Sequence, residues 1–202
     1  MAGVGETGAP GELKVILTDR EIELAIRNNR LRIDPPPPSE AYSATAVDLT
    51  LAAEAYEWPD PVTGANFELD PGKPGFSYQE LRSRFSKPLD LSGDGFSLKT
   101  HKFLLAWTRE RVVLPVEAGI AARVEGKSSL ARLGISVHVT APTIHAGFEG
   151  AVQLEVFNHG PNPVRLRAGM KVCQLIFELT WGTPSKAYAG QFLKQSAENQ
   201  RA

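Results

Sequence analysis

The stretch GISVHVTAPTIHAGFEGAVQLEVFNHGPNPVRL, residues 134–166, consists of short apolar runs that are separated by glycine and proline. Each run has the length of a β-strand, and AVQLEVF alternates large aliphatic side chains with other types. The same rhythm extends from residue 97 to residue 179, through the further runs FLLAW, VVLP, GIAARV and KVCQLIFEL. Strands at this spacing, without the helical segments that parallel βαβ units need, predict a mainly β fold, an antiparallel sandwich or barrel.

Before residue 97 the sequence predicts two short helices and one strand. TDRE at 18–21 and SYQE at 77–80 both have the capping-box pattern that marks the start of a helix. SATAVDLTL at 43–51 alternates with a period of two, which is typical of a strand. Residues 57–76 are rich in proline and glycine, and we expect them to form a loop.

Length and composition are those of a single domain and predict neither a nucleic-acid polymer nor a membrane as partner. The chain has 202 residues, 22 Lys and Arg against 23 Asp and Glu, and a net charge of -1, which argues against a nucleic-acid polymer as partner. Its one cysteine, Cys173, rules out an internal disulfide framework and favours the cytoplasm. No apolar stretch approaches the ~20 residues that cross a bilayer, so no membrane is expected.

Three common catalytic motifs are absent. EGKSS at 125–129 resembles the end of a P-loop, but Ala121 stands where that motif requires glycine. The four histidines and one cysteine form neither HExxH nor a paired CxxC, so zinc chemistry is not predicted. There is no GxSxG nucleophile elbow.

GKSSLAR, residues 126–132, concentrates polar chemistry in a turn and a single helical turn. Lys127 and Arg132 are cationic donors, and Ser128, Ser129 and their backbone N–H groups can also face a phosphate. The alternative is a surface turn without a ligand. From spacing alone, the phosphate-binding interpretation and the surface-turn interpretation both stay open.

Glu155 stands in the middle of the AVQLEVF strand. Alternation puts it on one face with Gln153 and Phe157, opposite the aliphatic residues. A carboxylate in a short apolar strand needs a partner or a function, unless that face is exposed to solvent.

Four segments together resemble the deoxycytidine triphosphate (dCTP) deaminases of the dUTPase-like superfamily, in that family's order. They are ILTDREI (16–22), AVDLTL (46–51), VEGKSSLARLGISVHVTAPTIHAGFEGAVQLEVFN (124–158) and RAGMKVCQLIFE (167–178). The resemblance spans about residues 15–190. It implies a jelly-roll-like antiparallel barrel with a short N-terminal helix, assembled as a homotrimer with three sites at subunit interfaces. We expect a flexible tail at 1–13, the catalytic barrel at 14–180, and a tail or lid at 181–202.

The resemblance also implies a reaction: hydrolysis of the 4-amino group of dCTP to give dUTP and ammonia, without zinc. Glu155 then matches the general base, which activates a water for attack on C4 of cytosine. Ser128 and the backbone carbonyl of Ala141 match the groups that hold this water. Arg132 matches the arginine that stabilises the charged arrangement around base and water.

Nucleotide binding follows from the same resemblance. Lys127, Ser128 and Ser129 match triphosphate donors, although arginine is usual where Lys127 stands, and lysine lacks its bidentate fork. Mg²⁺ is expected on the triphosphate, and dTTP is a possible inhibitor. The remaining substrate-binding candidates are His145, Gln153, Leu154 and Gln174, with Tyr188, Lys194 and Gln195 in the tail.

The nearest alternatives are dUTP pyrophosphatase activity, alone or coupled to deamination, and a non-catalytic nucleotide-binding regulator. dUTPases are typically apolar where Glu155 stands, and they carry the aspartate that activates water where His145 stands. Retention of Ser128, Arg132 and Glu155 together argues against a regulator. We expect His145 to contact the sugar, where deaminases also usually have aspartate; its alternative is a turn residue without a role. The preference among dCTP, dCMP, CTP and modified cytosine nucleotides stays open.

Overall fold

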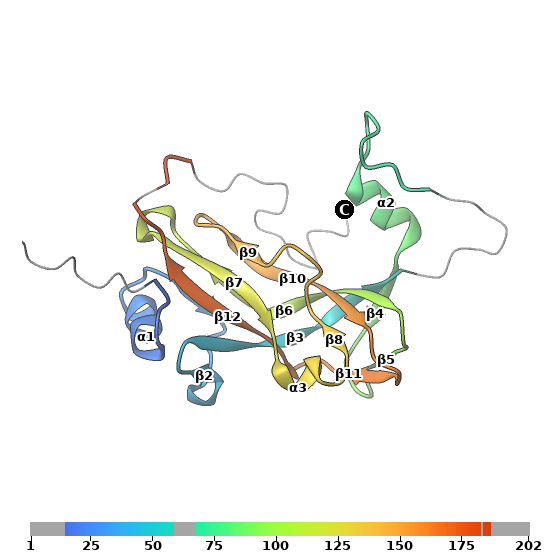
Figure 1. Ribbon diagram of the computed structural model, residues 1–202, viewed down its shortest axis with the longest axis horizontal. Helices are drawn as coiled ribbons and strands as arrows, with labels where there is room; N and C mark the ends of the chain where they lie inside the picture. The colour runs from blue at the N-terminus through green and yellow to red at the C-terminus, as the bar shows by residue number, and fades with distance from the viewer. Residues whose placement is uncertain (1–14, 59–67, 183, 187–202) are drawn as a thin grey trace, which may run out of the picture.

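The computed structural model describes residues 15–58, 68–182 and 184–186 (Figure 1). Its helical segments are α1 (Asp19–Arg27), η1 (Ser39–Ala41), α2 (Tyr78–Phe85), η2 (Val116–Ala118) and α3 (Ser128–Ala131). Its strands are β1 (Arg32–Asp34), β2 (Tyr42–Ser43), β3 (Ala46–Glu57), β4 (Lys87–Asp90), β5 (Phe96–Leu98), β6 (Phe103–Val113), β7 (Ile120–Gly126), β8 (Ile135–Ser136), β9 (Thr143–Ile144), β10 (Glu149–Asn158), β11 (Val164–Leu166) and β12 (Lys171–Leu179).

The main sheet is antiparallel and strongly curled, with the strand order β8-β10-β6-β3-β12-β7-β9. The long strand β3 joins its two layers: Val47–Thr50 pair with β12, and Leu51 and Ala55–Glu57 pair with β6, with a register shift between Leu51 and Ala55. Such an irregularity lets one strand turn from one layer into the next. The aliphatic faces of both layers meet in one core, where Leu49, Leu154 and Phe177 are fully buried. The predicted mainly β antiparallel fold is confirmed.

The prediction of separate strands for FLLAW and VVLP was wrong, because FLLAW and the first two residues of VVLP belong to the continuous strand β6. The polar residues between them suggested a turn. In the structure Thr108 Oγ1 donates to the Glu110 carbonyl, and the Glu110 carboxylate accepts from Thr50 N at 2.8 Å and Thr50 Oγ1 at 2.6 Å. Because the neighbouring strand satisfies these buried polar groups, the strand continues through them.

Both helices that the capping pattern predicted are present, with different caps. At α2 the Ser77 hydroxyl accepts from Glu80 N at 3.2 Å, as the pattern requires. At α1 the Thr18 hydroxyl instead donates to the Glu21 carboxylate, and α1 is held by burial of Ile22 and Ala25. Figure 1 shows α1 and α2 at opposite ends of the molecule. In the part of the chain that the structure describes, no helix is both long and apolar enough for a bilayer span.

Candidate active site

A cavity of about 690 Å³ lies against the outer face of β6 and β10, beside the segment that leads into α2. We call it the Glu155 cavity. Four of the predicted site residues line it: Glu155, Gln153, Ala141 and His145. The chain's own aromatic and aliphatic side chains form much of the remaining wall, including Trp58, Phe76, Tyr78, Phe103 and Leu105.

Glu155 points out of the sheet into this cavity because β10 alternates its faces. It pairs with Leu105 of β6 in the register of the sheet and is half-buried. Burial raises the pKa of the Glu155 carboxyl above its ordinary value, and a hydrogen bond from Val139 N at 3.5 Å and the nearby His138 only partly offset this. A carboxylate with a raised pKa is suited to accept and return a proton near neutral pH.

The segment after β8 brings His138 and Ala141 to the cavity. ISVHV was predicted as one strand, but only Ile135–Ser136 has strand structure. The next residues leave the sheet, and the N–H of Val139 donates to Glu155. His145 follows β9 in a tight turn, where its carbonyl accepts from Phe148 N at 3.1 Å, and its exposed side chain reaches the cavity rim.

Three side chains of the cavity wall have a buried polar nitrogen that makes no hydrogen bond of normal geometry with the described residues. They are Trp58 Nε1, His138 Nδ1 and Gln153 Nε2. Buried polar groups in native proteins are almost always hydrogen-bonded, so these three nitrogens around one cavity indicate a polar ligand or bound water.

The predicted phosphate-binding residues form a second cluster, which we call the α3 group: Lys127, Ser128, Ser129, Arg132 and Gln174. Ser128 and Ser129 belong to α3, Arg132 follows it, and all three side chains are exposed. Gln174 of β12 lies opposite Glu125 of β7, next to the start of α3. No residue of the α3 group lines the Glu155 cavity in the described structure.

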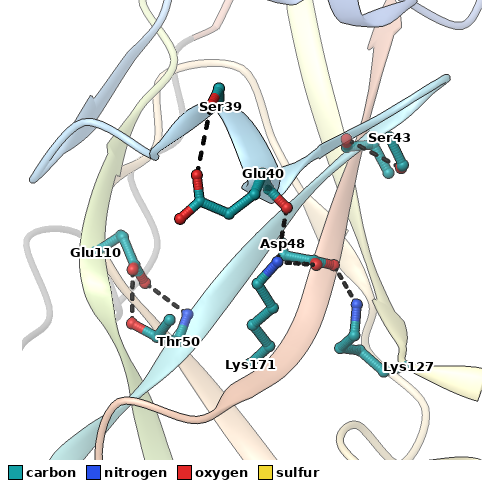
Figure 2. Close-up of polar contacts among 9 residues, drawn as sticks. Ser39, Glu40, Ser43, Asp48, Thr50, Glu110, Lys127 and Lys171 are labelled. Atoms are coloured by element: carbon teal, nitrogen blue, oxygen red, sulfur yellow. Dashed lines mark hydrogen bonds and ion pairs between the residues drawn. The ribbon is translucent and has the colours of Figure 1, made fainter. Parts of the chain in front are cut away.

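Lys127 is held by an ion pair with Asp48 of β3, whose side chain is only 14% exposed. Figure 2 shows Asp48 between two amino groups, because Lys171 Nζ also lies 3.2 Å from Asp48 Oδ2. Lys171 Nζ donates further to the carbonyl of Glu40 at 2.7 Å. Two lysines therefore share one carboxylate beside α3.

Other predicted site residues lie elsewhere. The Leu154 side chain is fully buried in the core on the opposite face of β10, so only its backbone is available for binding. Tyr188, Lys194 and Gln195 lie outside the described residues, as do the predicted tail at 1–13 and most of that at 181–202. Within residues 15–58, 68–182 and 184–186, no three His, Cys, Asp or Glu side chains gather as a metal site would require.

Residues 16–180 match the family model described as dCTP deaminase-like. The chain belongs to this family. It is 37% identical over 174 residues to a dCTP deaminase of Rhodospirillum rubrum, covering 86% of this chain and 87% of the relative. It is also 37% identical to a dUMP-forming dCTP deaminase of Methanosphaera stadtmanae, covering 86% and 83%.

Among solved structures, the 2′-deoxycytidine 5′-triphosphate deaminase of Agrobacterium tumefaciens is similar to this chain, with a TM-score of 0.62 and 26% identity. The match covers 82% of this chain and 48% of the solved one, so this chain spans about half the length of that protein. The likeness shows that this chain shares the fold of that deaminase.

The sequence did not predict the role of Trp58, Tyr78, Phe103, Leu105 and His138 in forming the cavity. The capping pattern at 77–80 predicted that Tyr78 lies on a helix, but the sequence spacing did not predict where that helix packs. His138 belongs to the run ISVHV, whose alternation predicted an ordinary strand.

Proposed function

We propose that this protein deaminates dCTP by hydrolysis, giving dUTP and ammonia. The observation that carries the proposal is Glu155, a half-buried carboxylate with a raised pKa on the wall of a cavity, in a chain 37% identical to proteins named dCTP deaminase. Glu155 takes a proton from water as the hydroxide oxygen bonds to C4 of cytosine and the C4=N3 double bond opens, its electron pair moving to N3. It then returns that proton to the 4-amino group, the C4–N4 bond breaks with loss of ammonia, and the proton left on the oxygen moves to N3 as the C4 carbonyl forms.

We further infer that each site is completed by a second copy of the chain. The Glu155 cavity holds the proposed base together with Ala141, whose carbonyl is expected to orient the water. Ser128 and Arg132, the water's other proposed partner and the charge-stabilising arginine, belong to the α3 group. Their separation within one chain supports sites at subunit interfaces and the expected homotrimer.

The α3 group would receive the triphosphate as its Mg²⁺ complex, because Mg²⁺ in such sites is held largely by phosphate oxygens. Lys127, Ser128, Ser129 and Gln174 are the proposed donors. Lys127 would exchange part of its contact with Asp48 for phosphate, and Lys171 would keep that carboxylate neutralised. A triphosphate with another base, such as dTTP, would compete for the same group. Zinc independence and a cytoplasmic location stay predictions.

One assay tests the proposed reaction. The wild-type protein and a Glu155→Gln variant are incubated with MgdCTP, and products are separated by chromatography with ammonia measured in parallel. The proposal predicts equal amounts of dUTP and ammonia from the wild type, and a rate lower by at least about 100-fold in the variant. No turnover of any cytosine nucleotide, with dCTP still bound, would favour the regulator.

A second candidate is deamination coupled to pyrophosphate release. The similarity to a relative named dUMP-forming favours it, whereas His145, in place of the aspartate expected for attack on phosphorus, argues against it. The same chromatogram separates the two: dUTP supports deamination alone, and dUMP with pyrophosphate supports the coupled reaction.

A further inference from the structure

Gln153 lies two residues before Glu155 on the same face of β10 and lines the same cavity. Its Nε2 atom is buried without a hydrogen bond of normal geometry. An amide N–H in this state costs about 1–3 kcal/mol of unfolding free energy unless a ligand or water accepts from it. The Gln153 amide has two N–H donors, and the Tyr78 hydroxyl beside it can accept from only one of them, which leaves a donor for a ligand or water.

Tyr78, the first residue of α2, stands next to this amide. Burial raises the pKa of the Tyr78 hydroxyl, a side-chain hydrogen bond with Gln153 and the charge of Arg82 lower it, and the charge of Glu155 raises it, so the polar ends of Tyr78, Gln153 and Glu155 lie near one another. The outer face under α2 is firmly packed. Arg82 of α2 stacks over the Tyr56 ring at 4.7 Å, and Tyr56 meets Trp107 edge to face with 5.6 Å between ring centroids. Tyr78 is thus carried on an anchored helix.

We propose that Gln153 is a specificity-determining residue that donates through Nε2 to the ring carbonyl oxygen O2 of the bound base, and that Tyr78 is the positioning residue that orients its amide. The inference rests on the proposed deamination. It adds a side-chain contact to the base that is separate from the proton transfer at C4.

The chemistry of cytosine selects O2 as the acceptor. The ring offers two acceptors, N3 and O2. N3 adjoins C4, the carbon under attack, and so falls within the reach of Glu155. O2 lies on the far side of N3 and is left for a second donor. Residues i and i+2 of a strand are about 7 Å apart on one face, so the side chains of Gln153 and Glu155 can meet two points of one ring.

Discrimination by such a contact is measurable, because a site built around a hydrogen bond rejects a ligand that cannot make it. We compare kcat/KM for dCTP and for 2-thio-dCTP, in which a weakly accepting sulfur replaces O2. The wild type should prefer dCTP by about tenfold or more. Gln153→Met, which keeps the length of the side chain without its amide, should lower kcat/KM for dCTP by about tenfold and bring the preference close to one.

Tyr78→Phe removes only the hydroxyl. This variant should lose part of the preference for dCTP over 2-thio-dCTP. The Tyr78→Phe/Gln153→Met double variant should have the same kcat/KM for dCTP as Gln153→Met alone, because Tyr78 acts through Gln153. Tyr42→Phe, in β2 and outside the cavity lining, is the matched control and should keep the full preference. Melting temperatures check that each variant is folded.

An unchanged preference in folded, active Gln153→Met would overturn the inference and leave the amide to a bound water. Additive losses in the double variant would overturn the positioning role of Tyr78. A wild-type protein that turns over neither nucleotide overturns the proposed function, and this inference with it.

Discussion

At the scale of single residues, the proposed role of Glu155 conflicts with the stability of the fold. As the proposed general base it must be ionised to accept a proton, yet burial makes its ionised form unfavourable in the folded state. Because its folded pKa lies above the unfolded one, ionisation weakens the fold as pH rises through the window between the ordinary carboxyl value and the raised one. Above that window the loss is complete and constant.

Glu155→Gln should therefore gain stability relative to the wild type at pH 8 and gain less at pH 4, where the wild-type carboxyl is protonated. Melting temperatures of both proteins at a series of pH values measure this. Glu117→Gln, at an exposed carboxylate in η2, serves as the control. A difference between Glu155→Gln and wild type that does not change with pH would contradict the raised pKa.

At the scale of elements, α3 is fixed by a close approach of two glycines. Gly134, three residues after α3, has φ +89°, and a Cβ built there would lie 2.4 Å from the backbone N of Gly160. The two segments are also joined by a hydrogen bond from His159 N to the Gly134 carbonyl at 2.7 Å. This contact sets where α3 stands against the end of β10.

Gly134→Ala should lower the free energy of unfolding by about 2–4 kcal/mol, since it adds a backbone clash to the strain of a positive φ. Gly93→Ala is the matched control: Gly93 has φ +56° but no atom within 4 Å of the added Cβ, so only about 1 kcal/mol is expected. Urea unfolding gives both values. Equal effects of the two substitutions would show that the close approach is unimportant.

The elements also mark the limits of sequence-based prediction. Period-two alternation located β3, β10 and β12, because each buries one face. It failed for β6, where buried polar residues are satisfied by β3, and for short strands such as β4, whose KPLD sequence has no apolar alternation. Glu155 could be predicted because a carboxylate interrupts an apolar strand. Tyr78 could not, because its place depends on how α2 packs.

At the scale of the whole molecule, both halves of the proposed site are flanked by exposed apolar side chains. Leu133, next to the α3 group, is 54% exposed, and Val139, beside the Glu155 cavity, is 58% exposed. Exposed apolar surface next to functional residues is typical of contact with a partner. In a cyclic trimer the cavity of each copy would face the α3 group of its neighbour, so that both residues become buried together.

A site shared between copies predicts a specific gain of activity on mixing. Glu155→Gln disables a cavity and Arg132→Ala disables an α3 group, so neither variant alone should deaminate dCTP. In trimers assembled from equal amounts of both, about a quarter of the sites combine an intact cavity with an intact neighbouring α3 group, and about a quarter of wild-type activity should return. Sites made within one chain would regain nothing. The double variant mixed equally with wild type gives an independent check: shared sites predict about a quarter of full activity, whereas sites within one chain predict about half.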